Sequence, residues 1–217
     1  CPLPCVCVIP CACLRTSTIR VLPDMSLSQQ SIYEYLKELS AKVSTPGGGA
    51  AAALTGAQAA ALISMVAEFS SKSMAKAERD AVLQAASSAR NEFIELAELD
   101  ARKFAELMKC YKSGNGVQGA LKGAAGAPLA CISLASSLVE PLEIIYKSGN
   151  ANLVTDTGIA ASLLLSTING SILNVLINLQ SIEDTAFVSE TKSGLDQCAP
   201  VKAKLETIAN KITSDLS

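Results

Sequence analysis

The sequence predicts an all-α fold, a bundle of about six helices around a buried central helix. Apolar residues recur at helical rather than alternating spacing, and aromatic residues make up only 4% of the chain. Glycine- and proline-containing breaks divide these apolar stretches into segments of helical length. A chain of 217 residues is long enough to bury a substantial core as a single domain.

Two parts of unequal size are expected along the chain. Residues 1–24 are rich in proline, hold five of the eight cysteines and lack a helical period, so we interpret them as a leader outside the domain. This leader is either extra upstream sequence or a targeting-like segment. Its closely spaced cysteines lack the second, distant pair of ligands that structural zinc sites use, so no metal site is predicted. Met25 then opens a helical domain over residues 25–217.

The helix boundaries follow from the apolar periodicity and from the breaks. The predicted helices cover residues 27–43, 49–72, 76–112, 118–147, 153–182 and 193–215. The predicted breaks are Thr45–Gly49, Ser113–Gly116, Ser148–Asn150 and Thr191–Gly194.

Charge and residue usage exclude several classes of function. A net charge of −2 offers no broad attraction for nucleic acid or anionic lipid. The chain has no histidine, which excludes serine–histidine triads and histidine-ligated metals. Scattered cysteines in the body are typical of reduced thiols and favour a cytoplasmic location, or an organellar one if the leader is a targeting segment.

The stretch Leu153–Leu179 is long and apolar enough to cross a membrane. It also carries Asp156, Asn169, Asn174 and Asn178, and polar groups of this kind are costly in lipid. We therefore expect the buried central helix of a soluble bundle and no membrane partner.

Asp100 stands out on its helix because it falls within an apolar stripe that includes Phe93, Leu96 and Phe104. An ionised carboxylate facing a core costs several kcal/mol unless it is paired, hydrogen-bonded or protonated. Asp100 is therefore either a site residue with a raised pKa or a structural carboxylate that caps or pairs with a neighbour.

The helix that begins near Asn152 is apolar nearly all round and has one narrow polar or small-residue stripe. This stripe comprises Asp156, Ala160, Thr167, Gly170, Ser171, Asn174 and Asn178. Because unsatisfied buried polar groups cost about 1–3 kcal/mol each, the stripe must face either a ligand or a closely packed helix. Asp156 also lies in the first turn, where the helix dipole favours its ionised form.

Gly47, Gly48 and Gly49 immediately precede a predicted helix. Free backbone N–H groups at a helix start can bind an anion or a carbonyl, and glycines permit close approach of a flat ring. A plain flexible turn explains the same run, and it is not a nucleotide P-loop because no lysine followed by serine or threonine comes after it.

Five motifs, in order, resemble the cyclodeaminase domain of the formimidoyltransferase-cyclodeaminases and the related methenyltetrahydrofolate cyclohydrolases. They are Thr45–Ala53, Asp100–Ala101 with Phe104, Ala127–Leu129, Gly149–Asp156 and Asn174–Leu179. The similarity covers residues 27–188, with Thr155 where the family usually has serine.

The resemblance implies an enzyme that releases ammonia from a formimino-tetrahydrofolate and forms the methenyl bridge. Asp100 and Asp156 are then the expected catalytic residues, and no cofactor is expected. The expected substrate-binding residues are Gly47, Gly48, Gly49, Asn152, Thr155, Asn174 and Asn178. The alternatives are a methenyltetrahydrofolate cyclohydrolase and an inactive folate-binding or scaffold homologue. A homodimer is expected from the resemblance and from the amount of apolar surface.

Overall fold

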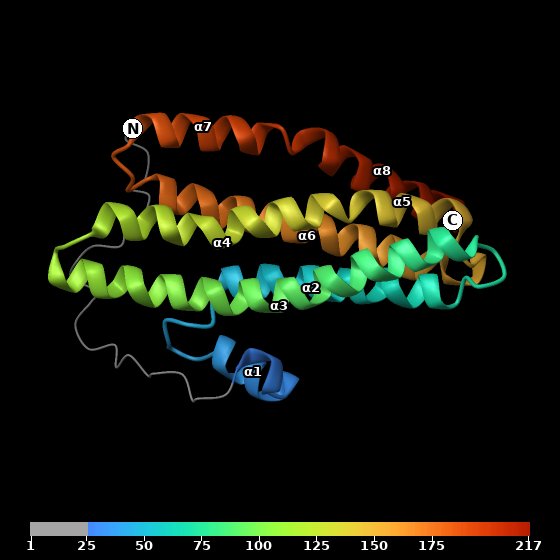
Figure 1. The fold of residues 1–217 in the computed structure, drawn as a ribbon, viewed down its shortest axis with the longest axis horizontal. Coiled ribbons are helices and arrows are strands. Elements are labelled where there is room, and N and C mark those ends of the chain that lie inside the picture. The colour runs from blue at the N-terminus through green and yellow to red at the C-terminus, as the bar shows by residue number, and fades with distance from the viewer. Residues whose placement is uncertain (1–25) are drawn as a thin grey trace.

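The computed structural model describes residues 26–217, and within that range it contains helices and short connections but no strand (Figure 1). The predicted all-α class is therefore confirmed. The α-helices are α1 (Ile32–Leu39), α2 (Gly48–Glu68), α3 (Lys76–Ser113), α4 (Val117–Ser137), α5 (Val139–Ser148), α6 (Val154–Leu179), α7 (Thr185–Asp196) and α8 (Ala199–Asp215). The predicted leader lies outside the described residues.

Long helices run roughly along one common direction in Figure 1, with α2 beside α3, α4 and α5 beside α6, and α7 and α8 along the far edge. Helix α6 contacts α2, α4, α5 and α8 and is therefore the central helix that was predicted. Its inner side is fully buried at Leu164, Ile168 and Val175. The prediction that this helix is buried was only partly correct, however, because one side of α6 remains exposed, at Ile159 and Leu173 among others.

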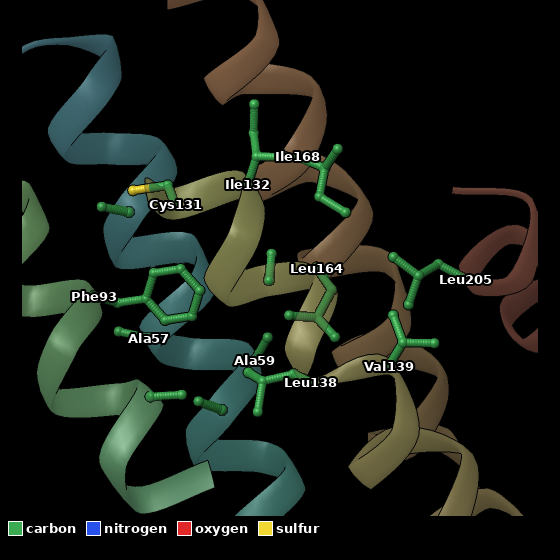
Figure 2. Packing of buried hydrophobic residues seen from close by; sticks show 14 of the residues in the cluster. Ala57, Ala59, Phe93, Cys131, Ile132, Leu138, Val139, Leu164, Ile168 and Leu205 are labelled. Carbon is green, nitrogen blue, oxygen red and sulfur yellow. The ribbon is translucent and has the colours of Figure 1, made fainter. Parts of the chain in front are cut away.

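The core is built mainly from alanine and branched aliphatic side chains, with Phe93 as its largest fully buried member. Figure 2 shows the Phe93 ring reaching from α3 toward Ala57 on α2, and Leu164 and Ile168 of α6 facing Ile132 of α4. The ring lies against Gly56, where an added Cβ would come within 2.6 Å of two ring carbons. Small residues on α2 thus make room for a large one on α3.

Helices α2 and α6 run antiparallel and pack closely. Gly170 of α6 faces Ala52 of α2, and a Cβ at Gly170 would lie 3.2 Å from the Ala52 methyl group. At the other end of the pair, the backbone N–H of Asn150 donates to the Ser70 hydroxyl at 2.9 Å. The middle of the polar stripe on α6 therefore faces a neighbouring helix, as one of the two predicted options required.

Local signals explain most of the helix ends. Ser31 and Glu34 form a capping box at the start of α1. Gly114 and Gly116, between α3 and α4, adopt positive φ angles that favour glycine. The predicted break at Thr191–Gly194 was wrong: these residues lie inside α7, which is capped by Asp184, and the chain breaks instead at Gln197 and Cys198, just before Pro200. The predicted 118–147 helix is divided at Leu138 into α4 and α5.

Three segments are long and apolar enough to cross a membrane by length and composition: Gly48–Glu68, Val117–Ser148 and Ala151–Leu179. In the bundle, between 39% and 56% of the most apolar window of each segment is buried. Their apolar residues therefore supply most of the core that the helices share.

We predict that Gly56→Ala destabilises the fold by about 1–3 kcal/mol, because the new methyl group would overlap the buried Phe93 ring. Gly126→Ala is the matched control, since nothing lies within 4 Å of its Cβ position on α4. There, alanine should raise stability by up to about 1 kcal/mol through helix propensity. Urea unfolding of both variants measures the difference, and equal effects would contradict the packing described here.

Candidate functional site

Asp100 projects from the middle of α3 onto the first turn of α2. Its carboxylate occupies the space where a side chain at Gly49 would begin, so a larger residue at that position would displace the carboxylate. The backbone N–H of Ala50 donates a hydrogen bond to the same carboxylate. The sequence prediction that Asp100 turns away from the solvated face of its helix is therefore confirmed, and its neighbour is the start of another helix.

The start of α2 carries no side-chain cap, because its N-cap residue is Gly47. Apart from Ala50, whose N–H is bonded to Asp100, the first N–H groups of the helix are thus left for a ligand or water. These groups also present the positive end of the helix dipole. Among the three predicted glycines, Gly49 permits the close approach of Asp100, and the available hydrogen-bond donors lie at the same helix start.

Asn174 of α6 closes a second side of this helix start. Its side-chain amide lies 3.8 Å from the Cβ position of Gly48, while its Nδ2 donates to the Gly170 carbonyl at 2.8 Å. Asn178, one turn later, donates in the same way to the Asn174 carbonyl at 2.8 Å. Both side-chain amides are therefore held in place by their own helix. The Oδ1 atom of each remains available, in a fixed orientation, to accept a hydrogen bond.

Two further polar groups beneath this arrangement were not among the predicted site residues. Cys131 of α4 is buried, and burial raises the pKa of its thiol to about 12, with the nearby Asp100 charge acting in the same direction. The Ser171 hydroxyl, 1% exposed, hydrogen-bonds to this thiol. Ser171 belongs to the polar stripe seen in the sequence, whereas a single cysteine in an apolar helix gave no signal.

Burial raises the pKa of Asp100 above its ordinary value of 3.8, and the hydrogen bond from Ala50 opposes this shift only in part. The described residues place no lysine or arginine in an ion pair with it. A carboxyl group in this setting holds a proton more readily than an exposed one and can deliver it to a bound ligand.

Asn152, Thr155 and Asp156 lie elsewhere in the chain, at the start of α6. Asp156 is half-buried in the first turn, and Asn152 and Thr155 are exposed. Because α6 is a continuous helix, the difference of eighteen positions between Asp156 and Asn174 separates them by about 27 Å. A single chain therefore brings Gly48, Gly49, Asp100 and Asn174 together, with Gly47 and Asn178 next to them along α2 and α6. It does not bring Asp156 to Asp100.

The fold and the site together define an all-helical bundle protein with a half-buried carboxylate at a glycine helix start. The profile of the formiminotransferase-cyclodeaminase family matches residues 31–197, and the chain belongs to that family. A methenyltetrahydrofolate cyclohydrolase from Methylorubrum extorquens is 31% identical over 77% of this chain and 88% of its own length.

The chain matches only part of the larger relatives. The formimidoyltransferase-cyclodeaminase of Rattus norvegicus is 29% identical over 84% of this chain, which corresponds to 37% of the rat protein. The crystal structure of a formiminotetrahydrofolate cyclodeaminase from Thermotoga maritima superposes with a TM-score of 0.78 at 33% identity. The match covers 86% of this chain and 96% of the Thermotoga chain.

We predict that Asp100→Asn makes the protein more stable near pH 7, because the raised pKa means that ionising Asp100 costs folding free energy there. That cost is absent below the ordinary pKa of 3.8 and appears as the pH rises through the folded-state pKa. The stability gap between variant and wild type should therefore close on acidification. Urea unfolding at several pH values tests this, with exposed Glu95→Gln on the same helix as the control. A variant less stable at every pH would contradict the assignment.

Proposed function

We propose that this protein is an enzyme of folate one-carbon metabolism, a formimidoyltetrahydrofolate cyclodeaminase. The observation that carries the proposal is the Asp100 carboxyl group, held against Gly49 with a raised pKa, with the Asn174 amide beside the adjacent Gly48. Family membership and the similarity to the Thermotoga maritima cyclodeaminase support the same substrate class.

In the proposed reaction, the N10 amine of the folate attacks the formimino carbon carried on N5. The resulting tetrahedral intermediate expels ammonia and leaves a methenyl bridge between N5 and N10. Holding N10 and the carbon in attack geometry supplies much of the rate enhancement. Asp100, as the neutral acid, protonates the departing nitrogen, and Asp156 of the second chain in the proposed homodimer stabilises the cationic product.

The remaining predicted residues orient the substrate. The free N–H groups at the start of α2 donate to carbonyl or anionic groups of the ring system. The Asn174 and Asn178 side chains offer amide oxygens as acceptors for ring N–H groups. Asn152 and Thr155, beside Asp156 at the other end of α6, contribute from the second chain of the proposed homodimer. The reaction as proposed calls for neither a metal ion nor an organic cofactor.

A methenyltetrahydrofolate cyclohydrolase is the second candidate, and the relative from Methylorubrum extorquens specifically favours it. That reaction adds water to the same methenyl bridge and yields a formylated folate. Both reactions pass through a tetrahedral carbon between N5 and N10, so the same carboxyl groups serve either one. An inactive folate-binding homologue is the non-enzymatic alternative.

We predict that the purified protein releases ammonia from formimino-tetrahydrofolate, and that Asp100→Asn and Asp156→Asn each lower the rate by about 10²–10⁴-fold through loss of acid–base or charge stabilisation. Ammonia release measures the deaminase reaction, and loss of methenyl-folate absorbance measures the hydrolase reaction. Glu95→Gln, an exposed change on α3, should leave both rates unchanged. Folate binding without turnover of either substrate would favour the scaffold alternative.

The proposal also includes a soluble, cytoplasmic homodimer with no nucleic-acid or membrane partner. Because the three apolar segments that match a membrane span are shared with the bundle core, the protein should stay in the supernatant when cells are lysed without detergent. Recovery in the lipid fraction would contradict this part of the proposal.

A further inference from the structure

Three of the predicted site residues, Asn152, Thr155 and Asp156, lie on one short segment. They occur where the short 3-10 helix η3 (Ala151–Leu153) runs directly into the first turn of α6. No described residue forms an ion pair with Asp156. The direction in which this carboxylate points therefore depends on how the backbone of the segment is held.

The Asn150 side chain joins this segment to the end of α2. Its Oδ1 atom accepts a hydrogen bond from the backbone N–H of Asn152 at 3.1 Å, which caps the start of η3. Its Nδ2 atom donates to the carbonyl of Phe69, the residue that ends α2, at 3.2 Å. One amide thus bonds an N–H group at a helix start and a carbonyl group at a helix end, where both kinds of group lack partners within their own helix.

A buried hydroxyl supplies a second contact between the same two elements. Ser70 is 1% exposed, and its hydroxyl donates to the Val66 carbonyl and accepts the backbone N–H of Asn150 at 2.9 Å. Because the one hydroxyl proton is already directed at Val66, only the lone pairs of the oxygen remain for Asn150. We call the hydrogen bonds among Phe69, Ser70, Asn150 and Asn152 the Ser70–Asn150 link.

Close packing holds the segment on either side of Asp156. A Cβ at Gly149 would lie 3.3 Å from Val66 of α2, so the chain passes close to α2 immediately before the Ser70–Asn150 link. A Cβ at Gly158 would likewise lie 3.3 Å from Ile212 of α8. The segment is therefore packed against both α2 and α8, and the link provides its polar contacts with α2.

Helix α2 thus supports both groups of predicted site residues. At its first turn, Gly49 lies against the Asp100 carboxylate, and just beyond its last turn Ser70 bonds Asn150. The 21 residues of α2 span about 30 Å between these two contacts. The Ser70–Asn150 link therefore sets the level and orientation of the Asp156 segment relative to the Asp100 group of the same chain.

We propose that Ser70 and Asn150 are positioning residues of the reaction. They act through Asp156, by fixing the backbone that carries this carboxylate, and neither needs to touch the substrate. The proposal rests on the proposed function, in which Asp156 stabilises the cationic product. A misplacement of a catalytic group by about 1 Å can lower a rate by about 100-fold.

Turnover by Ser70→Ala tests the proposal at a temperature where circular dichroism shows the variant folded. Its kcat for formimino-tetrahydrofolate should fall by about 10–100-fold. Ser136→Ala on α4 is the matched control, because the Ser136 hydroxyl also donates to the carbonyl four residues earlier, at 2.7 Å. It should keep the wild-type kcat. A folded Ser70→Ala variant with wild-type kcat would overturn the proposal.

A double-mutant cycle distinguishes positioning from a merely structural role. In the Asp156→Asn background, Ser70→Ala should lower kcat far less than in wild type, because the group through which it acts has lost its charge. A structural role predicts the same fold-loss in both backgrounds, so equal losses would overturn the proposal.

Asn150→Ala is a second variant, at a half-buried position, in case Ser70→Ala does not fold. It removes both side-chain bonds of the Ser70–Asn150 link and leaves the Ser70 hydroxyl in place. Its kcat should fall in the same range. Wild-type kcat in the folded Asn150→Ala variant would overturn the proposal equally.

Amide hydrogen exchange tests the link without turnover. In Ser70→Ala, the backbone N–H groups of residues 150–156 should exchange faster than in wild type, while those of α4 keep their rates. Unchanged exchange would overturn the proposal even if kcat falls. If wild type turns over neither folate but exchange responds as expected, the proposed function fails, and the positioning role with it, while the link stands. If wild type is active and the folded variants match it, only the positioning role fails.

Discussion

The arrangement of this protein depends on how closely α2 approaches its neighbours at its first turns. Gly49 leaves room for the Asp100 carboxylate, Gly56 for the Phe93 ring, and Ala52 meets Gly170 across the pair of α2 and α6. At each contact, a glycine on one helix leaves room for a group from the other helix. The same small residues that let the bundle close also bring a carboxyl group, an amide and unpaired N–H groups together at one helix start.

Much of this could be predicted from the sequence because it follows from periodicity and turn residues. The helical period of the apolar residues predicted the class, and Ser113–Gly116 and Ser148–Asn150 predicted true breaks. The start of α7 was missed because Thr191–Gly194 has turn-like composition, while the actual signals, the Asp184 cap and the break before Pro200, compete with it. Local composition does not show which of two weak breaks the tertiary packing will use.

The candidate site shows a different limit. The position of Asp100 within an apolar stripe marked it as unusual, and the structure shows its contact with Gly49 and Ala50. The sequence placed Asp156 and Asn174 on the same polar stripe. It did not show how far apart the two residues lie along a straight helix. One-dimensional spacing gives the face of a helix, whereas distance along its axis separates groups that share that face.

The buried Cys131 thiol has a practical consequence. With its pKa near 12, the thiol stays protonated at neutral pH, and its burial beneath Asp100 keeps it from reagents in solution. Any labelling of this sulfur would require α4 to separate from α2 and α6, so its rate of modification would follow the opening of the bundle next to Asp100. The rate at which Cys131 is modified would thus report local opening of the bundle at a buried position, which a label introduced on the surface would not report.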